Sequence, residues 1–483
     1  MSKKISLLFL LSCFFIFLSH RSSAQCHLWT GLQQVQSTTA TNWIFGNDVS
    51  PERDKLGRPF VYIAAAWGGL WVYDINLPAN PVRVATVAPS VYGGDYAIRP
   101  YQVGNRLYLV TGNIWANSSE PPGLAIFDIS NPASPVFLDH YSQQGGLQGA
   151  GVVVVRDDYA YLGSNVNGLT ILDISDSSNI QFKSRIDFLN NFPHTQQGND
   201  SMYNARGLQI QGDYAYVCYD RGGLRVVNIS DVNNPVQVNQ YCFPDLINKA
   251  TAYNNIEIHD TLAFVALDYA GLEILSIADP MNIYQVAWWK PNDWPAPTND
   301  IGVWGNSPGH ANEIEYDSTC SKLYVSAGRS NVVAISVADP SNPVTCEIFP
   351  TPILNRGAWG IDLFQNELYV TYLFSAFFPY NFDTLGFASF MTPSCSVLSN
   401  EDQIAEIVPQ VYPNPFHEDF TINLGQFYAN TEISLYNTLG QKLIDKQYPL
   451  CEAIELEAPN ETGIYFLEVK VEGKVFNFKL VRE

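Results

Sequence analysis

The chain has 483 residues, with 26 Lys and Arg against 47 Asp and Glu and a formal net charge of −21 at pH 7. This balance argues against nucleic acid or an anionic membrane surface as a partner, because both need a basic footprint. Aromatic residues make up 13% of the chain and no long stretch has helical apolar spacing. We therefore expect an all-β protein with more than one domain.

Residues 1–24 have the layout of a secretory signal peptide. Lys3 and Lys4 precede an apolar run from Ile5 to Leu18, and Ser22-Ser-Ala24 supplies the small residues of a cleavage site. The apolar run is shorter than a helix needs to span a bilayer comfortably. We therefore expect an exported protein with no transmembrane segment in the mature chain.

Residues 25–393 are built on one repeated pattern, which is clearest between Ala205 and Val236. Three alternating apolar runs are separated there by Gly212-Asp213 and Gly222-Gly223, and a fourth run begins at Pro235-Val236. Period-2 alternation bounded by Gly, Asp and Pro predicts a four-stranded antiparallel meander. One such meander cannot bury both of its faces, so it must stack on copies of itself.

The copies can be followed by two landmarks. The landmark that ends the third run begins at Asp74, Asp128, Asp173, Asn228, Ser276 and Ser336. The landmark of the second run begins at Val61, Leu107, Ala160, Ala215, Ala263, Leu323 and Leu368. Four-stranded repeats at this spacing are typical of propeller blades. We predict a seven-bladed β-propeller, with six blades as the alternative.

The seventh repeat lacks a fourth strand with a Pro-Val start. An unpartnered alternating stretch at Leu28 to Gln36 could take that place, which would close the ring and remove its open edge. Cys26 and Cys395 lie at the two ends of this closure, and we predict a disulfide between them. Removal of Cys13 with the signal leaves seven cysteines, an odd number, so at least one thiol is free. The alternative is that Cys26 and Cys395 are free or paired elsewhere.

Gly223-Leu-Arg-Val-Val-Asn-Ile-Ser-Asp and Gly168-Leu-Thr-Ile-Leu-Asp-Ile-Ser-Asp resemble the LVIVD-repeat family of β-propellers. The resemblance covers residues 43–349 well and residues 350–392 poorly. It implies the fold and almost nothing about chemistry.

Residues 394–408 are polar and acidic and read as a linker, and residues 409–483 form a second domain. About seven short strands there predict a small Ig-like β-sandwich. Val411-Tyr-Pro-Asn-Pro-Phe, Asn437-Thr-Leu-Gly and Gly463-Ile-Tyr-Phe-Leu-Glu-Val resemble the C-terminal sorting domain of type IX secretion cargo. The resemblance implies contact with the secretion machinery, export across both membranes of a Gram-negative envelope, and release or attachment at the cell surface. An ordinary carbohydrate-binding or spacer sandwich is the alternative.

No pattern in the chain predicts catalytic chemistry. Gly305-Asn-Ser-Pro-Gly309 matches the letters of a nucleophile elbow, but no helix follows Pro308 in this long loop. The histidines stand singly, without the spacing of a paired metal site. Asp231-Val-Asn-Asn, or the loop with Asn292-Asp293 and Asn299-Asp300, could bind Ca²⁺, but neither has calcium-loop spacing. We expect no cofactor.

Long loops gather on one face of the predicted propeller. They run from Thr111 to Gly123, Asp187 to Ala205, Cys242 to Tyr253 and Trp288 to Asn312. Aromatic residues with a few polar groups on one face suggest a recognition surface. Its candidate ligand-binding residues are Trp67, Trp115, His194, Arg221, Trp294, Asp300, Trp304, His310 and Arg329. The alternative is that the tryptophans only fold the loops onto the blades.

We therefore predict a secreted or cell-surface, non-enzymatic propeller that binds a protein or glycan through this face. A secreted hydrolase or lyase with its site at the channel mouth is the first alternative, since the fold does not decide between the two. A spacer on the envelope without any ligand is the second.

Overall fold

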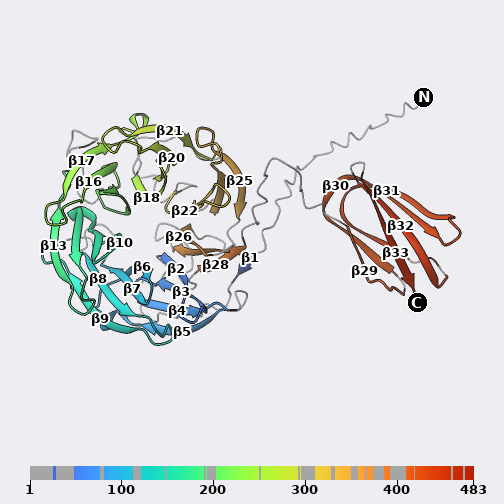
Figure 1. Cartoon of the computed structure of the whole chain (residues 1–483), viewed down its shortest axis with the longest axis horizontal. Helices are drawn as coiled ribbons and strands as arrows, with labels where there is room; N and C mark the ends of the chain where they lie inside the picture. Colours follow the sequence, from blue (N-terminus) through green and yellow to red (C-terminus); the bar gives the residue numbers. More distant parts are fainter. Residues whose placement is uncertain are drawn as a thin grey trace, which may run out of the picture. The chain divides into compact units, whose positions relative to one another are not determined.

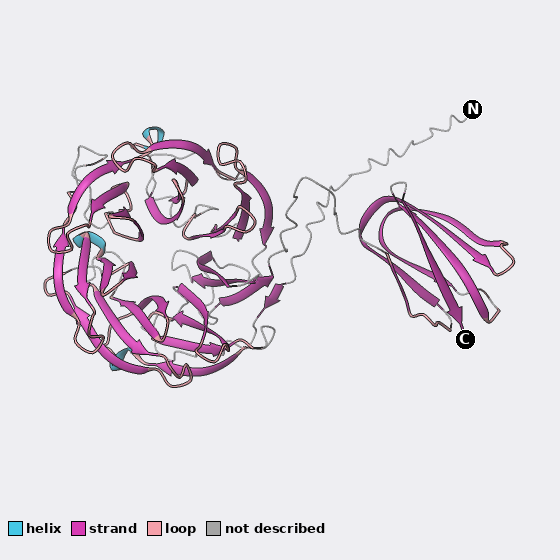
Figure 2. Cartoon of the chain, viewed as in Figure 1, coloured by secondary structure: helices cyan, strands magenta, loops and turns pink. Residues whose placement is uncertain are grey.

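The structure is a computed structural model of the chain. It describes residues 26–28, 48–76, 81–112, 121–146, 149–189, 192, 203–247, 249, 252–291, 294, 310–327, 332–349, 357–364, 367–373, 386–391, 409–417, 419–457, 459, 461–471 and 474–483. The chain divides into two compact units, Met1–Cys395 and Ser396–Glu483. Within the described ranges there is no α-helix, and the helical elements are single 3₁₀ turns at η1 (Pro89–Val91), η2 (Asn165–Asn167) and η4 (Pro244–Leu246). The all-β prediction is confirmed (Figure 2).

The described part of the first unit forms seven four-stranded antiparallel sheets, which we call blades 1 to 7. Blade 1 contains β2 (Asp48–Arg53), β3 (Pro59–Ala64), β4 (Leu70–Asp74) and β5 (Val82–Val87). Blade 2 contains β6 (Ala97–Val103), β7 (Arg106–Thr111), β8 (Gly123–Asp128) and β9 (Val136–Ser142). Blade 3 contains β10 (Val152–Arg156), β11 (Tyr159–Gly163), β12 (Leu169–Asp173) and β13 (Gln181–Ile186). Blade 4 contains β14 (Gly207–Gln211), β15 (Tyr214–Cys218), β16 (Leu224–Asn228) and β17 (Val236–Tyr241).

The remaining blades continue around the same centre, and Figure 1 shows the first strand of each blade nearest to it. Blade 5 contains β18 (Ala252–His259), β19 (Leu262–Asp268), β20 (Gly271–Ser276) and β21 (Tyr284–Trp289). Blade 6 contains β22 (Ile314–Asp317), β23 (Lys322–Ser326), β24 (Val332–Ser336) and β25 (Val344–Phe349). Blade 7 contains β26 (Gly357–Phe364), β27 (Glu367–Leu373), β28 (Gly386–Met391) and β1 (Cys26–Leu28). We call β2, β6, β10, β14, β18, β22 and β26 the inner strands.

The repeated residues build the turns of each blade. The carboxylate of Asp128 accepts a hydrogen bond from the backbone N–H of Ser130 at 2.8 Å, and the Asn228 side chain accepts one from Ser230 at 2.9 Å. These local bonds end the third strand and direct the chain into the fourth. Gly223 precedes the third strand of blade 4 with φ +76°, and a Cβ there would lie 2.3 Å from the carbonyl oxygen of Tyr241. Only glycine fits this position.

An apolar core lies between each two successive blades. Between blades 4 and 5, for example, Leu224 and Val226 pack with Val265 and Leu267. The last and first blades also share a core, in which Tyr369 of β27 packs with residues of β3 and β4. Alternating apolar side chains on both faces of each blade make this stacking possible, because every sheet has two covered faces.

The N-terminal strand supplies the fourth strand of blade 7. It pairs antiparallel with β28, with Leu28 opposite Ala388 and Cys26 opposite Phe390. The predicted closing strand is therefore present but begins earlier than expected, and residues 29–36 lie outside the described residues. Cys395 also lies outside them, so its disulfide with Cys26 stays a prediction. Cys320 is disulfide-bonded, and among the described cysteines Cys218, Cys242 and Cys346 are free.

The second unit is a five-stranded sheet with its own core. Its strands are β29 (Gln410–Tyr412), β30 (Asp419–Asn437), β31 (Lys442–Glu457), β32 (Gly463–Val471) and β33 (Lys474–Arg482). The strand order is β29-β30-β32-β33, and β31 pairs with β30. Ile422 and Leu435 of β30 pack with Leu467 of β32 in an apolar cluster. The Ig-like description of this unit stays a prediction.

Two motifs of the second unit have local structural roles. The side chain of Asn414 bridges to β33, since its amide donates to the carbonyl of Lys479 and its oxygen accepts from the N–H of Val481, both at 2.9 Å. The side-chain oxygen of Asn437 accepts hydrogen bonds from the backbone of Leu439 and Gln441, both at 3.0 Å. These bonds explain the asparagines of the Tyr-Pro-Asn-Pro and Asn-x-x-Gly motifs.

Candidate functional site

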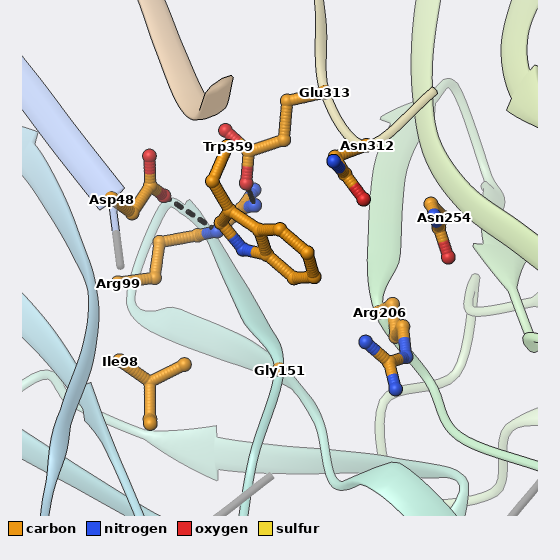
Figure 3. Close-up of a pocket in the computed structure, with 9 residues that line it drawn as sticks. All are labelled: Asp48, Ile98, Arg99, Gly151, Arg206, Asn254, Asn312, Glu313 and Trp359. Carbon is orange, nitrogen blue, oxygen red and sulfur yellow. Dashed lines mark hydrogen bonds and ion pairs between the residues drawn. The ribbon is translucent and has the colours of Figure 1, made fainter. Parts of the chain in front are cut away.

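The starts of the inner strands surround a small pocket, which we call the channel mouth (Figure 3). Its cavity volume is about 40 Å³. Every blade contributes to it, through Asp48, Arg99, Gly151, Arg206, Asn254, Glu313 and Trp359 in chain order. The mouth therefore depends on all seven blades together.

Arg99 links three blades at the mouth. Its Nε atom lies 2.8 Å from Oδ2 of Asp48, and its Nη2 atom forms an ion pair with Oε1 of Glu313. The second oxygen of Glu313 accepts a hydrogen bond from the backbone N–H of Ile361 in blade 7 at 3.1 Å. Burial raises the pKa of both carboxyl groups, and the guanidinium of Arg99 opposes that shift.

Two further polar pairs lie in blades 4 and 5. Arg206 Nε and Asp220 Oδ2 are 3.1 Å apart, and Asn204 donates to the same oxygen at 2.9 Å. His310 Nδ1 lies 2.7 Å from Asp268 Oδ1. Asp220 lies just after β15, and Asp268 is the last residue of β19. In both blades, this end of the second strand lies beside the start of the inner strand. The pairs thus belong to the same side of the ring as the mouth.

Three inner strands carry a β-bulge at the mouth. The register shifts between Ala97 and Arg99 in β6, between Tyr253 and Asn255 in β18, and between Ala358 and Ile361 in β26. The other four described inner strands pair regularly with their second strands. A bulge adds a residue and turns a side chain to a new direction.

The bulges coincide with residues of the mouth. Asn254 and Trp359 lie within the shifted segments, and Arg99 follows directly after the one in β6. Bulges between the third and fourth strands recur in blades 1 to 6 and belong to the repeat. The inner-strand bulges occur in three blades only, so the repeat does not require them.

A larger cavity of about 350 Å³ continues along the middle of the inner strands, and we call it the channel lumen. Six carboxylates line it, from Asp48, Glu52, Glu257, Glu313, Glu315 and Asp362. Arg99 is the one basic side chain among the described residues of this lining. Burial raises the pKa of Glu257 to about 7. Burial, reinforced by the neighbouring carboxylates, raises the pKa of Glu315 and Asp362 well above the usual range.

Family models match both parts of the chain. The LVIVD repeat matches residues 59–88, 121–143, 149–187 and 204–242. The secretion system C-terminal sorting domain matches residues 410–483. The chain is an LVIVD-repeat protein with a secretion sorting domain. The sorting domain marks it for export by the type IX secretion system to the cell surface or beyond, which implies an interaction with the secretion machinery.

Solved structures resemble this LVIVD-repeat protein at low identity. The computationally designed protein Ika8 is 9% identical with a TM-score of 0.44, covering 93% of this chain and 99% of Ika8. The WD40 repeats of RRP9 are 8% identical with a TM-score of 0.49, covering 72% of this chain and 99% of that one. The β-propeller domain of Cps50 (Swd1) from Myceliophteria thermophila is 9% identical with a TM-score of 0.46, covering 72% and 98%. No curated protein matches the chain.

None of the helices among the described residues has the length and apolar character needed to cross a membrane. The same residues contain no group of three or more His, Cys, Asp or Glu placed to hold a metal ion. Asp231, a candidate calcium ligand, accepts hydrogen bonds from the backbone and side chain of Asn233 at 3.0 Å, and Ca²⁺ binding at this turn stays a prediction. The other candidate calcium loop lies outside the described residues, and Ca²⁺ binding there stays a prediction.

The structure separates the predicted ligand-binding residues of this LVIVD-repeat protein. Trp294 is only 3% exposed and belongs to the core between blades 5 and 6, which favours the alternative that it folds its loop onto the blades. Trp67 contacts Tyr96 edge to face at 4.0 Å and does not line the mouth. Arg221 is half-buried in the β15–β16 turn, also away from the mouth lining. His310 pairs with Asp268 beside blade 5.

Five of the predicted residues lie outside the described residues, and their roles stay predictions. They are Trp115, His194, Asp300, Trp304 and Arg329. The mouth residues were missed because each stands alone in its own repeat, far along the chain from the others. One signal was available: a superposition of the repeats would have shown polar residues such as Arg99 and Glu313 near the start of otherwise apolar first strands.

Proposed function

We propose that this exported LVIVD-repeat protein is a non-enzymatic binding protein that holds a glycan at the channel mouth. The observation that carries the proposal is the set of three bulges that bring Arg99, Asn254 and Trp359 to the mouth. An indole offers an apolar face for the C–H side of a sugar ring. Amide, carboxylate and guanidinium groups offer paired donors and acceptors for hydroxyl groups.

The same proposal includes a closed, seven-bladed propeller. Its support is the seven four-stranded sheets, the apolar core shared by blades 7 and 1, and the pairing of β1 with β28. Closure would complete blade 7 with a fourth strand and leave the ring with only short, protected sheet edges. It would also hold the residues from all blades at fixed separations around the mouth.

A hydrolase or lyase is the second candidate function. Asp48 and Glu313 are carboxyl groups with raised pKa values in a cavity, a combination that is common in catalytic sites. Both, however, are ion-paired to Arg99, and each accepts a further backbone hydrogen bond. These contacts suit a structural link between blades better than a group that must exchange protons with a substrate.

Binding to immobilised glycans, followed by calorimetry with the best ligand, tests the proposal. We expect Trp359→Ala and Asn254→Ala to weaken binding at least tenfold, because each removes a contact made at the mouth. Trp67→Ala is the matched control, since Trp67 lies outside the mouth lining, and it should change affinity less than twofold. Full glycan affinity in both mouth variants would refute the proposal.

The catalytic alternative needs a separate assay. The wild-type protein would be incubated with polysaccharides and with ester and phosphate substrates, and products would be measured. We expect no turnover. Reproducible turnover that is lost in Asp48→Asn or Glu313→Gln would establish the hydrolase or lyase instead.

A further inference from the structure

The channel lumen has a marked excess of negative charge. Six carboxylates face one guanidinium, and that guanidinium is already bound at the mouth end by Asp48 and Glu313. Glu257, Glu315 and Asp362 lie deeper along β18, β22 and β26. Gln209 donates a hydrogen bond to Glu257 at 3.1 Å. Among the described residues of its lining, the lumen thus sets six carboxylates against the single cation of Arg99.

Like charges in a partly enclosed space repel one another. The free-energy cost of keeping these groups charged falls when a cation enters. Burial raises the pKa of Glu257, Glu315 and Asp362, and repulsion from neighbouring carboxylates adds to the shift at Glu315 and Asp362. A cationic ligand would restore these groups to their charged form. Neutral or anionic ligands would gain nothing from them.

The carboxylates are spread along the channel and do not meet at one point. Glu313 directly precedes β22 and Glu315 lies within it, and two residues of extended chain span about 7 Å. No three of the described acidic, His or Cys side chains are placed to hold one metal ion. A flexible cation with several separated charges therefore fits the lumen better than a single ion does.

Asn312 provides a second, independent indication of a ligand with N–H groups. Its side chain is 4% exposed, and its amide nitrogen donates to the carbonyl of Ala358 at 3.3 Å. Its Oδ1 atom has no hydrogen-bond partner among the described residues. Figure 3 shows this side chain at the mouth beside Glu313, and Glu313 lines both the mouth and the lumen. A buried acceptor without a partner is costly, and an N–H donor of a ligand would remove that cost.

We propose that the channel binds a linear aliphatic polyamine. One ammonium group lies at the mouth near Asn312 and Glu313, and the others lie along Glu315, Glu257 and Asp362. This site shares the mouth with the glycan proposal, but Glu257, Glu315 and Asp362 line only the lumen, so a test on these three can fail without affecting the glycan proposal.

Calorimetric titration of the purified protein with spermidine at low ionic strength tests this proposal. The test variant carries Glu257→Gln, Glu315→Gln and Asp362→Asn, which remove repulsion and so should not impair folding. The matched control carries Asp158→Asn, Asp245→Asn and Asp260→Asn, at exposed positions of the same unit, and removes the same number of carboxyl groups. We expect the test variant to bind spermidine at least tenfold more weakly and the control to change less than twofold.

Thermal unfolding gives a second readout. Spermidine should raise the unfolding temperature of the wild type and of the control, and not that of the test variant, because a ligand stabilises only the state that binds it. Absence of spermidine binding to the wild type, or equal weakening in the two triple variants, would overturn the proposal. Equal weakening would mean that spermidine is attracted to the acidic surface in general and not to the lumen.

Two further titrations distinguish other cations. If Ca²⁺ bound the wild type more tightly than spermidine and depended on the same carboxylates, the site would be a metal site and the polyamine proposal would fail. If an oligolysine peptide bound through these carboxylates and spermidine did not, the ammonium group would come from a protein side chain, which would also overturn it. We expect spermidine to bind more tightly than either.

Discussion

Glu273 shows how one buried residue joins two blades. It is fully buried on β20 and accepts hydrogen bonds from Tyr241 at 2.7 Å, Gln285 at 2.8 Å and Tyr253 at 3.0 Å. Tyr241 belongs to blade 4 and the other two to blade 5. Burial nevertheless raises the pKa of Glu273 to about 7, since three hydrogen bonds do not compensate for the loss of water.

Glu273 should make stability depend on pH. Its pKa in the folded state is above the 4.5 of the unfolded chain, so the folded state holds the proton more tightly. The resulting stabilisation, about 3 kcal/mol, is present below pH 4.5 and is lost as the pH rises to about 7. Chemical unfolding of wild type and Glu273→Gln across this range should show the difference between them changing by that amount. Asp260→Asn is the exposed control, and a difference independent of pH would contradict the prediction.

At the scale of elements, the bulge in β26 joins the last blade to the first. Gly360 lies in the bulge, and a Cβ on it would be 2.6 Å from Cα of Asp48 in β2 and 2.6 Å from Oγ1 of Thr371. Blades 7 and 1 therefore approach each other at a backbone contact that any side chain would block. The same bulge carries Trp359 at the mouth, so closure and site geometry share one element.

Gly360→Ala should destabilise the protein by about 2 kcal/mol, because overpacking forces the two backbones apart. It should also weaken glycan binding at the mouth, since Asp48 and Trp359 both border the displaced contact. Denaturant unfolding and calorimetry measure the two effects. The control is Gly212→Asn in an open turn, where φ is +55° and no atom lies within 4 Å of an added Cβ. Wild-type stability and affinity in Gly360→Ala would show that the approach is not needed.

At the scale of the whole molecule, the chain has two units with separate cores. Each unit is compact by itself, and the core of the sorting domain contains only residues of that domain. Binding and export are therefore assigned to different parts of the chain. This separation allows each part to be altered while the other stays folded.

Deletion of residues 409–483 should abolish export and leave the folding of the propeller region unchanged. Fractionation of the producing cells should find the truncated protein retained inside the envelope, with the unfolding temperature of the remaining unit unaltered. A reporter fused to residues 409–483 is the converse control and should be exported. If the truncated protein still reached the cell surface or the medium, the assignment of export to this domain would be wrong.

The sequence by itself determined the local structure of this protein. Asp128, Asn228 and Gly223 act over a few residues, through side-chain turns and a backbone position that only glycine allows, so their spacing revealed the blades. The sorting domain was recognisable for the same reason, because Asn414 and Asn437 stand in short motifs. A strand from the N-terminal region in blade 7 could also be predicted, because the seventh repeat lacked a fourth strand and the stretch from Leu28 to Gln36 had no partner nearby.

Only the tertiary structure decided the site. Asp48, Arg99 and Glu313 meet although hundreds of residues separate the first from the last, and no local pattern in the chain connects them. The bulges that place Asn254 and Trp359 at the mouth depend on pairing between strands, which a single strand does not encode. The burial of Trp294 is decided in the same way, because its position in a loop did not show that it packs against blade 6. Hydrogen bonds and backbone conformations within the turns determine the strands of each blade. The set of residues that line the channel is determined by the packing of blades that are far apart in the sequence.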